Sequence, residues 1–559
     1  MNRKSTLFRA FVIGSWLCVA AAAGSSATDS DLPAAIEERL SGPVLPEVRQ
    51  FRDFDLLFSE ISVFYAERDY QPAWIQNRRL SESARRVLAV LGSAEEHGLR
   101  SGDYLAGPLA TEGALITSKT DTRALATIDI ALAAQTMRYI KDLHSGRFTP
   151  RELKLGLDIA HKKLDLNGEL SRLLGVSDVR SFLESFAPQH RGYERLKERL
   201  GYYRKLAAED DWQPLDDSRV LEEGDGYPQA DRLRQRLVLT GDLDRAASSG
   251  APVYDAELVS AVVRFQTRHG LDSDGIIGEK TFEQLNRPWS DRVAQIAVSL
   301  ERWRWVPDDT ADRLIVVNVP SFWLRAFDDI HRPEMSALDS RVVVGKTYSQ
   351  FRTPIFNGVL QYLDFRPYWN IPGSLVRREI VPHLDEPGYL DEHEYEIVRE
   401  FGNNVQALPA TRDNIEKVKK GQLLLRQRPG PKNALGEVKF IFPNEHNVYL
   451  HSTPAKTLFA KSRRDFSHGC IRVADPVGLA EWLLSDQPAW NRQAIEQAMG
   501  KGAPTRVPVS QRTPVWILYI TALVDEPSGD LYFWEDIYGL DGTLARKLGH
   551  DLRSLLARG

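Results

Sequence analysis

Cysteine is almost absent from this chain. Only Cys18 and Cys470 occur in 559 residues. Cys18 lies in an apolar N-terminal segment that resembles a removable export signal, so the mature chain would keep one thiol and could form no internal disulfide. A free thiol in an oxidising compartment is prone to oxidation and stray pairing, so its retention needs a reason. It is either a buried residue that acts as a small hydrophobic side chain or a reactive group.

Long apolar runs are also missing after the N-terminus. Residues 1–27 have a basic start, an apolar run and then small residues, which is the layout of a secretory signal peptide. The apolar run is about 14 residues long, whereas a bilayer crossing needs ~20. A retained anchor is an alternative, and a lipoprotein signal is disfavoured because Leu17 stands where a small residue is needed. We expect cleavage after Ala23 or Ala27 and a protein without an integral membrane segment, working outside the cytoplasm.

Neither a dominant charge nor a metal-binding motif is present. The chain has 72 Lys and Arg against 77 Asp and Glu, a formal net charge of -5, which disfavours nucleic acid as a partner. With one retained thiol and no HxH or HExxH spacing, a closed tetrahedral zinc site cannot be assembled locally. We therefore expect neither a metal nor another cofactor.

The chain divides into segments of different hydrophobic period. Residues 28–215 have the spacing of amphipathic helices and are expected to form a helical scaffold domain. After a linker rich in Pro, Gly and acidic residues, residues 216–290 predict a small module of three helices. Residues 312–535 have the two-residue period of strands, with an insertion at about 368–437 and a tail at 536–559. The expected fold class is therefore multidomain α+β, with helical domains beside a β-rich core, and the insertion has the size of a lid.

The stretch FSHGCIRV surrounds the retained thiol. A thiol with an ordinary pKa near 8.5 is only a few per cent thiolate at neutral pH, so a cysteine nucleophile needs a base or a positive neighbour that lowers its pKa. His468 is two residues before Cys470, where the short tether makes base geometry difficult. His451 belongs to a separate predicted strand and can approach the sulfur across a strand pair. We expect His451 to be the general base and His468 to be a supporting donor or orienting group.

Gly469 and Arg472 complete this motif. Gly469 permits a turn that a Cβ would block, and that turn could aim backbone N–H groups, including that of Cys470, at a developing oxyanion. Arg472 either binds a substrate carboxylate or forms a surface salt bridge, and spacing alone leaves both open. The order of His451 before Cys470 disfavours papain-like peptidases, in which the cysteine comes first. Sortases have a far longer gap between the two residues.

Two stretches resemble known families. AVVRFQTRHGLDSDGIIGEKTF, residues 261–282, resembles a peptidoglycan-binding module, a kind of module that also serves as a passive spacer. YLHSTPAKTLFAKSRRDFSHGCIRV, residues 449–473, resembles the signature of L,D-transpeptidases with a YkuD-type catalytic domain. That signature is a His, a gap, then S-H-G-C followed by an aliphatic residue and Arg or Asn. The whole arrangement is similar to the large periplasmic YcbB-like subfamily.

The resemblance implies a β-sandwich catalytic core, a substrate-capping insertion and a periplasmic location. It implies that Cys470 is the acylated nucleophile and that His451 is its base, oriented by the backbone carbonyl of Ser452. Tyr449 and Arg472 match positions that line the family's substrate pocket. In the implied reaction Cys470 attacks the bond between diaminopimelate and D-Ala of a tetrapeptide stem. The amine of a second diaminopimelate then resolves the thioester into a 3→3 cross-link, and carbapenems are expected to acylate the same thiol.

Two other functions remain alternatives. An L,D-carboxypeptidase would use the same residues with water as the acceptor, and a non-catalytic scaffold would only bind peptidoglycan. The expected partners are tetrapeptide stems as donor and acceptor, and other cell-wall synthesis enzymes remain open as partners. Members of this subfamily can carry Ser in place of His468, so the resemblance does not make that residue indispensable.

Overall fold

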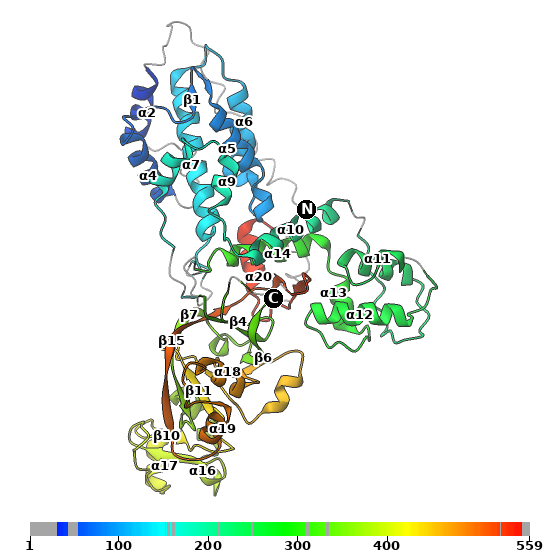
Figure 1. Cartoon of the computed structure of the whole chain (residues 1–559), viewed down its shortest axis with the longest axis vertical. Coiled ribbons are helices and arrows are strands. Elements are labelled where there is room, and N and C mark those ends of the chain that lie inside the picture. The colour runs from blue at the N-terminus through cyan, green and yellow to red at the C-terminus, as the bar shows by residue number, and fades with distance from the viewer. Residues whose placement is uncertain are drawn as a thin grey trace. The chain divides into compact units, whose positions relative to one another are not determined.

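The computed structural model describes residues 31–42, 54–150, 152–153, 157–158, 162–209, 212–247, 250–307, 312–330, 332, 335–525 and 527–550 (Figure 1). The predicted signal peptide, with Cys18, lies outside these residues. Contacts divide the chain into two compact units. The first contains Met1–Thr149, His161–Gly201 and Trp303–Val306, and the second contains Pro150–Ala160, Tyr202–Arg302 and Pro307–Gly559. Among the described helices, none combines the length and the apolar character that a bilayer crossing requires.

The first unit is helical. Its main helices are α2 (Leu32–Ser41), α4 (Phe54–Ala66), α5 (Glu82–Gly92), α6 (Ala106–Ala114), α7 (Thr122–Ser145), α8 (Leu166–Leu173), α9 (Val179–Glu184) and the start of α10 (Arg191–Glu209). The 24-residue α7 is capped by the side chain of Asp121 and is buried along most of its length. Its Asp129 accepts hydrogen bonds from the Tyr65 hydroxyl and from the backbone N–H groups of residues 73 to 75, which satisfies a fully buried carboxyl group.

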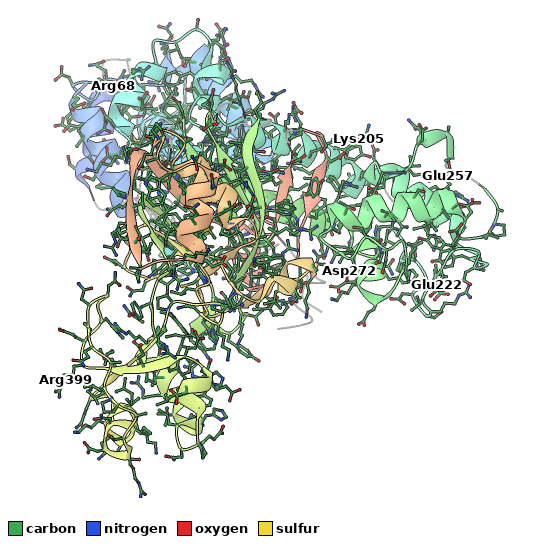
Figure 2. All side chains as sticks on the ribbon, turned by 60° about the horizontal axis from the view of Figure 1, so that its bottom comes forward. Arg68, Lys205, Glu222, Glu257, Asp272 and Arg399 are labelled. Carbon is green, nitrogen blue, oxygen red and sulfur yellow. The ribbon has the colours of Figure 1, made fainter. Side chains whose placement is uncertain are left out.

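The second unit contains the predicted three-helix module. Helices α11 (Ala230–Thr240), α12 (Ala256–Arg268) and α13 (Glu279–Leu285) enclose a hydrophobic core of their own. The buried side chain of Gln266 closes the glycine-rich turn, because it accepts from the Gly275 N–H and donates to the Ile276 carbonyl. Acidic side chains point outward from this module, as Figure 2 shows for Glu222, Glu257 and Asp272.

The β-rich core is one sheet that closes on itself. The strands are β3 (Leu157–Asp158), β4 (Leu314–Asn318), β5 (Trp323–Phe327), β6 (Ser336–Gly345), β7 (Ile355–Phe365), β11 (Val438–Ile441), β12 (Leu450–His451), β13 (Asp465–Ser467), β14 (Ile471–Val473) and β15 (Thr505–Leu518). Nine of them run in the order β11-β12-β14-β6-β5-β4-β15-β7-β3, and β13 pairs with β6 beside this path. Strand β7 also pairs with β11, which closes the sheet into a ring. The two layers expected of a sandwich are therefore parts of one continuous sheet. The helical scaffold and the β-rich core together confirm the predicted α+β fold class.

Helices and a hairpin complete the unit around this sheet. They are α14 (Trp289–Trp303), α18 (Pro476–Leu483), α19 (Arg492–Gly500), α20 (Leu540–Leu548) and the strands β16 (Ala522–Val524) and β17 (Leu531–Phe533). The module contacts this hairpin, because the Arg268 guanidinium donates to the Leu531 carbonyl and the His269 ring stacks on Phe533 at 5.7 Å between ring centres. Residues 536–548, which the sequence predicted as part of a C-terminal tail, also pack within the second unit. There the Asp541 carboxylate pairs with the Arg302 guanidinium.

The predicted insertion is a subdomain with its own small core, drawn in yellow at one end of β7 and β15 in Figure 1. It consists of strands β8 (Trp369–Asn370), β9 (Tyr395–Val398) and β10 (Leu424–Gln427), helices α15 (Gly373–Leu375), α16 (Tyr389–Glu392) and α17 (Arg412–Lys419), the π-helix η6 (Val376–Ile380) and the short helix η7 (Val381–His383). Buried Asn433 joins its two ends, because its side chain donates to the Pro367 carbonyl at 3.0 Å and accepts from the Leu435 N–H at 2.8 Å.

Candidate active site

The strand register brings His451 and Cys470 together. Strand β12 pairs in parallel with β14, with His451 opposite Arg472 and Leu450 opposite Ile471. Cys470 immediately precedes β14, and the N–H of Ile471 donates to the Tyr449 carbonyl at 3.1 Å. The predicted strand pair is therefore present, while the role of His451 as the base for Cys470 stays a prediction.

The imidazole of His451 is buried and oriented. Its Nδ1 lies 2.5 Å from the carbonyl oxygen of Ser452. A carbonyl can only accept a hydrogen bond, so Nδ1 carries the proton and the lone pair of the neutral ring is on Nε2. Burial, reinforced by the positive charge of Arg472, lowers the pKa of His451 to about 3. The ring is therefore neutral at neutral pH and able to accept a proton.

Cys470 is half-buried, and its environment differs from the sequence expectation. Burial raises the pKa of its thiol above the ordinary value, although hydrogen bonds from Tyr449 and the charges of Lys439 and Arg472 act in the opposite direction. The expectation of a thiol pKa lowered by its neighbours was therefore wrong, because the burial outweighs them. At neutral pH the thiol of Cys470 and the imidazole of His451 are therefore both uncharged.

Lys439 is a site residue that sequence reasoning missed. It lies on β11 opposite His451, so Lys439, His451 and Arg472 form a row across one face of three paired strands. We call this row the strand side. The Lys439 ammonium lies 3.6 Å from the ring centre of Tyr449, a cation–π contact. Burial lowers the pKa of Lys439, and the nearby Cys470 opposes that shift.

Arg472 turns inward toward this site. Within the described part of the chain it forms no ion pair, and its buried Nε has no hydrogen-bond partner. Burial lowers the pKa of its guanidinium, and the charge of Cys470 opposes the shift. A surface salt bridge is therefore disfavoured for Arg472, and a charged guanidinium with a free donor is left beside the nucleophile.

Hydrogen bonds that involve Thr353 and Tyr538 support the turn at Gly469, directly before Cys470. We call it the nucleophile turn. Gly469 has φ +116°, a conformation that other residues rarely adopt, although a Cβ would meet only ordinary contacts at 3.7 Å or more. The Thr353 hydroxyl donates to the Gly469 carbonyl at 2.8 Å, and the N–H of Thr353 donates to the Tyr538 hydroxyl at 3.0 Å. Gly345 lies close behind, where a Cβ would come within 1.9 Å of the Phe351 carbonyl oxygen.

His468 faces the insertion. Its Nε2 lies 2.8 Å from a carboxylate oxygen of Glu379, which the π-helix η6 carries. The Phe351 ring from the short helix η5 (Ser349–Phe351) meets the imidazole edge-on at 4.7 Å between ring centres, and the Arg378 guanidinium lies 4.8 Å from the centre of the Phe351 ring. We call His468, Glu379 and Phe351 the loop side. The burial of His468 lowers its pKa, and the charge of Glu379 opposes that shift.

No group of three or more His, Cys, Asp or Glu side chains among the described residues could hold a metal ion. The side chains of this site are a thiol, an imidazole and the positive charges of the strand side, a set of groups that supports nucleophilic chemistry.

Comparison with known proteins identifies the domains. Residues 312–517 match the family described as the L,D-transpeptidase catalytic domain, YkuD. The chain contains a YkuD L,D-transpeptidase catalytic domain. Residues 59–200 match a scaffold domain, and residues 231–285 match a family described as "Putative peptidoglycan binding domain". This order of domains fits the YcbB-like layout.

A protein of Haemophilus influenzae, named "Putative L,D-transpeptidase", is similar to part of this chain. The two are 33% identical over 253 residues, which cover 45% of this chain and 49% of the relative. The match therefore spans about half the length of that relative.

The second unit also contains candidate site residues that the motif does not reveal. Besides Lys439, they are Thr353 and Tyr538 behind the nucleophile turn and Glu379 of the insertion. The sequence held one signal for Lys439. In the strand VKFI this lysine alternates with Val438 and Phe440, which are buried in the structure. The others come from distant segments, and no local spacing indicates them.

Proposed function

We propose that this chain is a peptidoglycan L,D-transpeptidase of the periplasm, in which Cys470 is the nucleophile and His451 the general base. The observation that supports the proposal is the pairing of β12, which ends at His451, with β14, which directly follows Cys470, within the residues that match a YkuD domain. A peptidoglycan-binding domain in the same chain supports the same substrate.

In the first half-reaction, Nε2 of His451 takes the thiol proton while the Cys470 sulfur attacks the carbonyl between diaminopimelate and D-Ala. Backbone N–H groups of the turn, including that of Cys470, stabilise the oxyanion, as in other acyl-transfer enzymes. The carbon–nitrogen bond breaks, His451 returns the proton to the leaving D-Ala amine, and a thioester remains on the sulfur. Lys439 and Arg472 stabilise the developing thiolate and attract the carboxylates of the donor stem.

In the second half-reaction, the uncharged amine of a diaminopimelate on a neighbouring stem attacks the thioester. A carbon–nitrogen bond forms, the carbon–sulfur bond breaks, and the proton that the amine loses is transferred to the sulfur through His451. The product is a 3→3 cross-link. An acceptor held in place can compete with water because its effective concentration is high. We assign to the insertion the task of limiting water at the thioester.

The test uses the purified protein with a disaccharide-tetrapeptide, and mass spectrometry of the products. Dimers that lack one D-Ala are expected with the unsubstituted protein and are expected to be absent with Cys470→Ala. Tripeptide monomers alone would indicate the L,D-carboxypeptidase, and unchanged tetrapeptide would favour the non-catalytic scaffold. A carbapenem should add its own mass to the protein only while Cys470 is present.

A further inference from the structure

A hydrogen bond joins the insertion to the nucleophile turn. Glu379 and His468 are 89 residues apart in the chain and meet with 2.8 Å between carboxylate and Nε2. Both side chains remain accessible, with 44% of Glu379 and 27% of His468 exposed. A carboxylate and an imidazole thus lie at the surface, two residues from Cys470, and the donor chemistry described above uses neither.

Local packing holds this pair in position. On the π-helix η6, Val376 and Ile380 are buried in the core of the insertion, which leaves Glu379 facing outward. On the other side, the Phe351 ring contacts the imidazole of His468. The two ends of the insertion are joined through Asn433, so the position of Glu379 follows from a packed subdomain rather than from a loose loop.

The strand side and the loop side of Cys470 differ in the charges that they carry. Lys346 and Arg472 oppose protonation of the imidazole, whereas Glu379 favours it. The strand side carries positive charge, and Asp364, a carboxylate near Lys439, is engaged by two hydrogen bonds from Arg506 at 2.7 and 3.0 Å. Glu379 therefore supplies negative charge where the nucleophile turn meets the insertion.

The acceptor of the second half-reaction needs this combination of groups. A primary amine resembles the lysine side chain, with a pKa near 10.4, so at neutral pH it arrives as an ammonium ion and cannot attack. It must be attracted, held and deprotonated before a carbon–nitrogen bond can form. A carboxylate attracts the ammonium, and a neutral imidazole can take its proton.

We propose that Glu379 and His468 form the acceptor-amine subsite, which binds the cationic amine of the acceptor stem and receives its first proton. This inference rests on the proposed transpeptidase function. The ammonium binds the Glu379 carboxylate and gives one proton to Nδ1 of His468, the ring nitrogen with the lone pair, because Nε2 donates to Glu379. The amine thereby becomes a nucleophile, and His468 releases that proton to solvent. The amine then attacks the thioester, the carbon–sulfur bond breaks, and the second amine proton returns to Cys470 through His451.

The first experiment compares Glu379→Gln with a matched control, Glu386→Gln. Glu386 also pairs with a histidine of the insertion, with 2.7 Å to Nδ1 of His383, but not with the nucleophile turn. For each protein, release of D-Ala from tetrapeptide reports the first half-reaction. The ratio of dimer to tripeptide and the KM for acceptor report the second.

With Glu379→Gln, D-Ala release should stay within about twofold, while the dimer-to-tripeptide ratio falls about tenfold and the acceptor KM rises about tenfold, because one charge-assisted contact is lost. Glu386→Gln should behave like the unsubstituted protein. An unchanged ratio in Glu379→Gln, or an equal fall in both variants, would overturn the subsite.

A second measurement separates binding of charge from a structural effect. Hydroxylamine is uncharged at neutral pH and cleaves thioesters directly, so its reaction with the acyl-enzyme should be unaffected by Glu379→Gln. An equal loss with hydroxylamine and with the ammonium acceptor would overturn the proposal. If the unsubstituted protein forms a thioester but never a dimer, the acceptor subsite fails while acylation by Cys470 stands. If it forms no thioester, the proposed function itself fails and this inference with it.

Discussion

The strand side and the loop side flank Cys470 with opposite chemistry. On the strand side, a buried and neutral His451 lies in one row with two cations, Lys439 and Arg472. On the loop side, a partly exposed His468 pairs with the carboxylate of Glu379. The two histidine rings therefore differ in their charge environment and in their accessibility, and we propose a different task for each.

This difference matches the difference between the two substrates of the proposed reaction. A donor stem carries carboxylates near the bond that is cleaved, and an acceptor stem presents an ammonium group. Opposite charges on the two sides would direct each stem to its own side of the thioester. The following experiments disturb one side and leave the other unchanged.

Replacing the base should have the largest effect. His451→Gln removes the lone pair that takes the thiol proton, and we expect D-Ala release to fall by about 10² to 10⁴-fold, the usual contribution of a general base. Circular dichroism should verify that the variant is folded. A loss of less than tenfold in a folded variant would mean that another group takes the proton.

The same substitution should change acid stability. The folded-state pKa of His451 is about 3, below the ordinary value of 6.5, so the unfolded chain binds this proton first. Stability from this residue is full above pH 6.5 and is lost as the pH falls toward 3. At pH 4.5, two units below the unfolded pKa and still above the folded pKa, the loss is about 3 kcal/mol.

His451→Gln lacks that titration. Its midpoint in urea should therefore fall less between pH 7 and pH 4.5 than that of the unsubstituted catalytic domain. If the urea midpoints of the two proteins fell by the same amount between pH 7 and pH 4.5, that result would contradict the burial of a neutral His451 ring.

Removing a cation from the strand side should have a smaller effect. Lys439 lowers the pKa of Cys470, so Lys439→Met should raise that pKa and shift the pH profile of iodoacetamide labelling upward, with acylation slower by about tenfold. The matched control is Lys432→Met, because that ammonium donates to the Glu392 carbonyl within the insertion. A labelling profile shifted downward, or moved equally by both variants, would disprove the role of Lys439.

The nucleophile turn offers the smallest effect. Gly469→Ala forces φ +116° on a residue with a Cβ and should destabilise the catalytic domain by about 1–2 kcal/mol while slowing acylation. In Gly542→Ala the new Cβ meets nothing within 4 Å inside α20, so stability should hold or rise. Thermal unfolding measures both. Equal melting temperatures for the two variants would mean that the turn can relax.

Part of this site could be predicted from the sequence. Strand patterns at residues 447–452 and 470–473 placed His451 and Cys470 on separate strands, and the structure pairs them. A glycine directly before the thiol predicted an unusual turn, and Gly469 has a positive φ. Local pattern carries this information because strand period and glycine conformation depend on neighbouring residues.

The rest depends on long-range packing. Lys439 reaches His451 through the register of β11, which no local pattern specifies. Glu379 arrives on the insertion and Tyr538 from near the end of the chain. The direction of the Cys470 pKa shift was predicted wrongly, because the sequence shows charged neighbours but not the burial that outweighs them. The signal peptide and the domain boundaries stay predictions.

The most direct test of the account is intact-protein mass spectrometry after brief incubation with a tetrapeptide stem, with Cys470→Ala in parallel. The account predicts an adduct with the mass of the stem less D-Ala, carried by Cys470 and absent from the variant. An adduct that persists in Cys470→Ala, or D-Ala release without any dependence on Cys470, would contradict it.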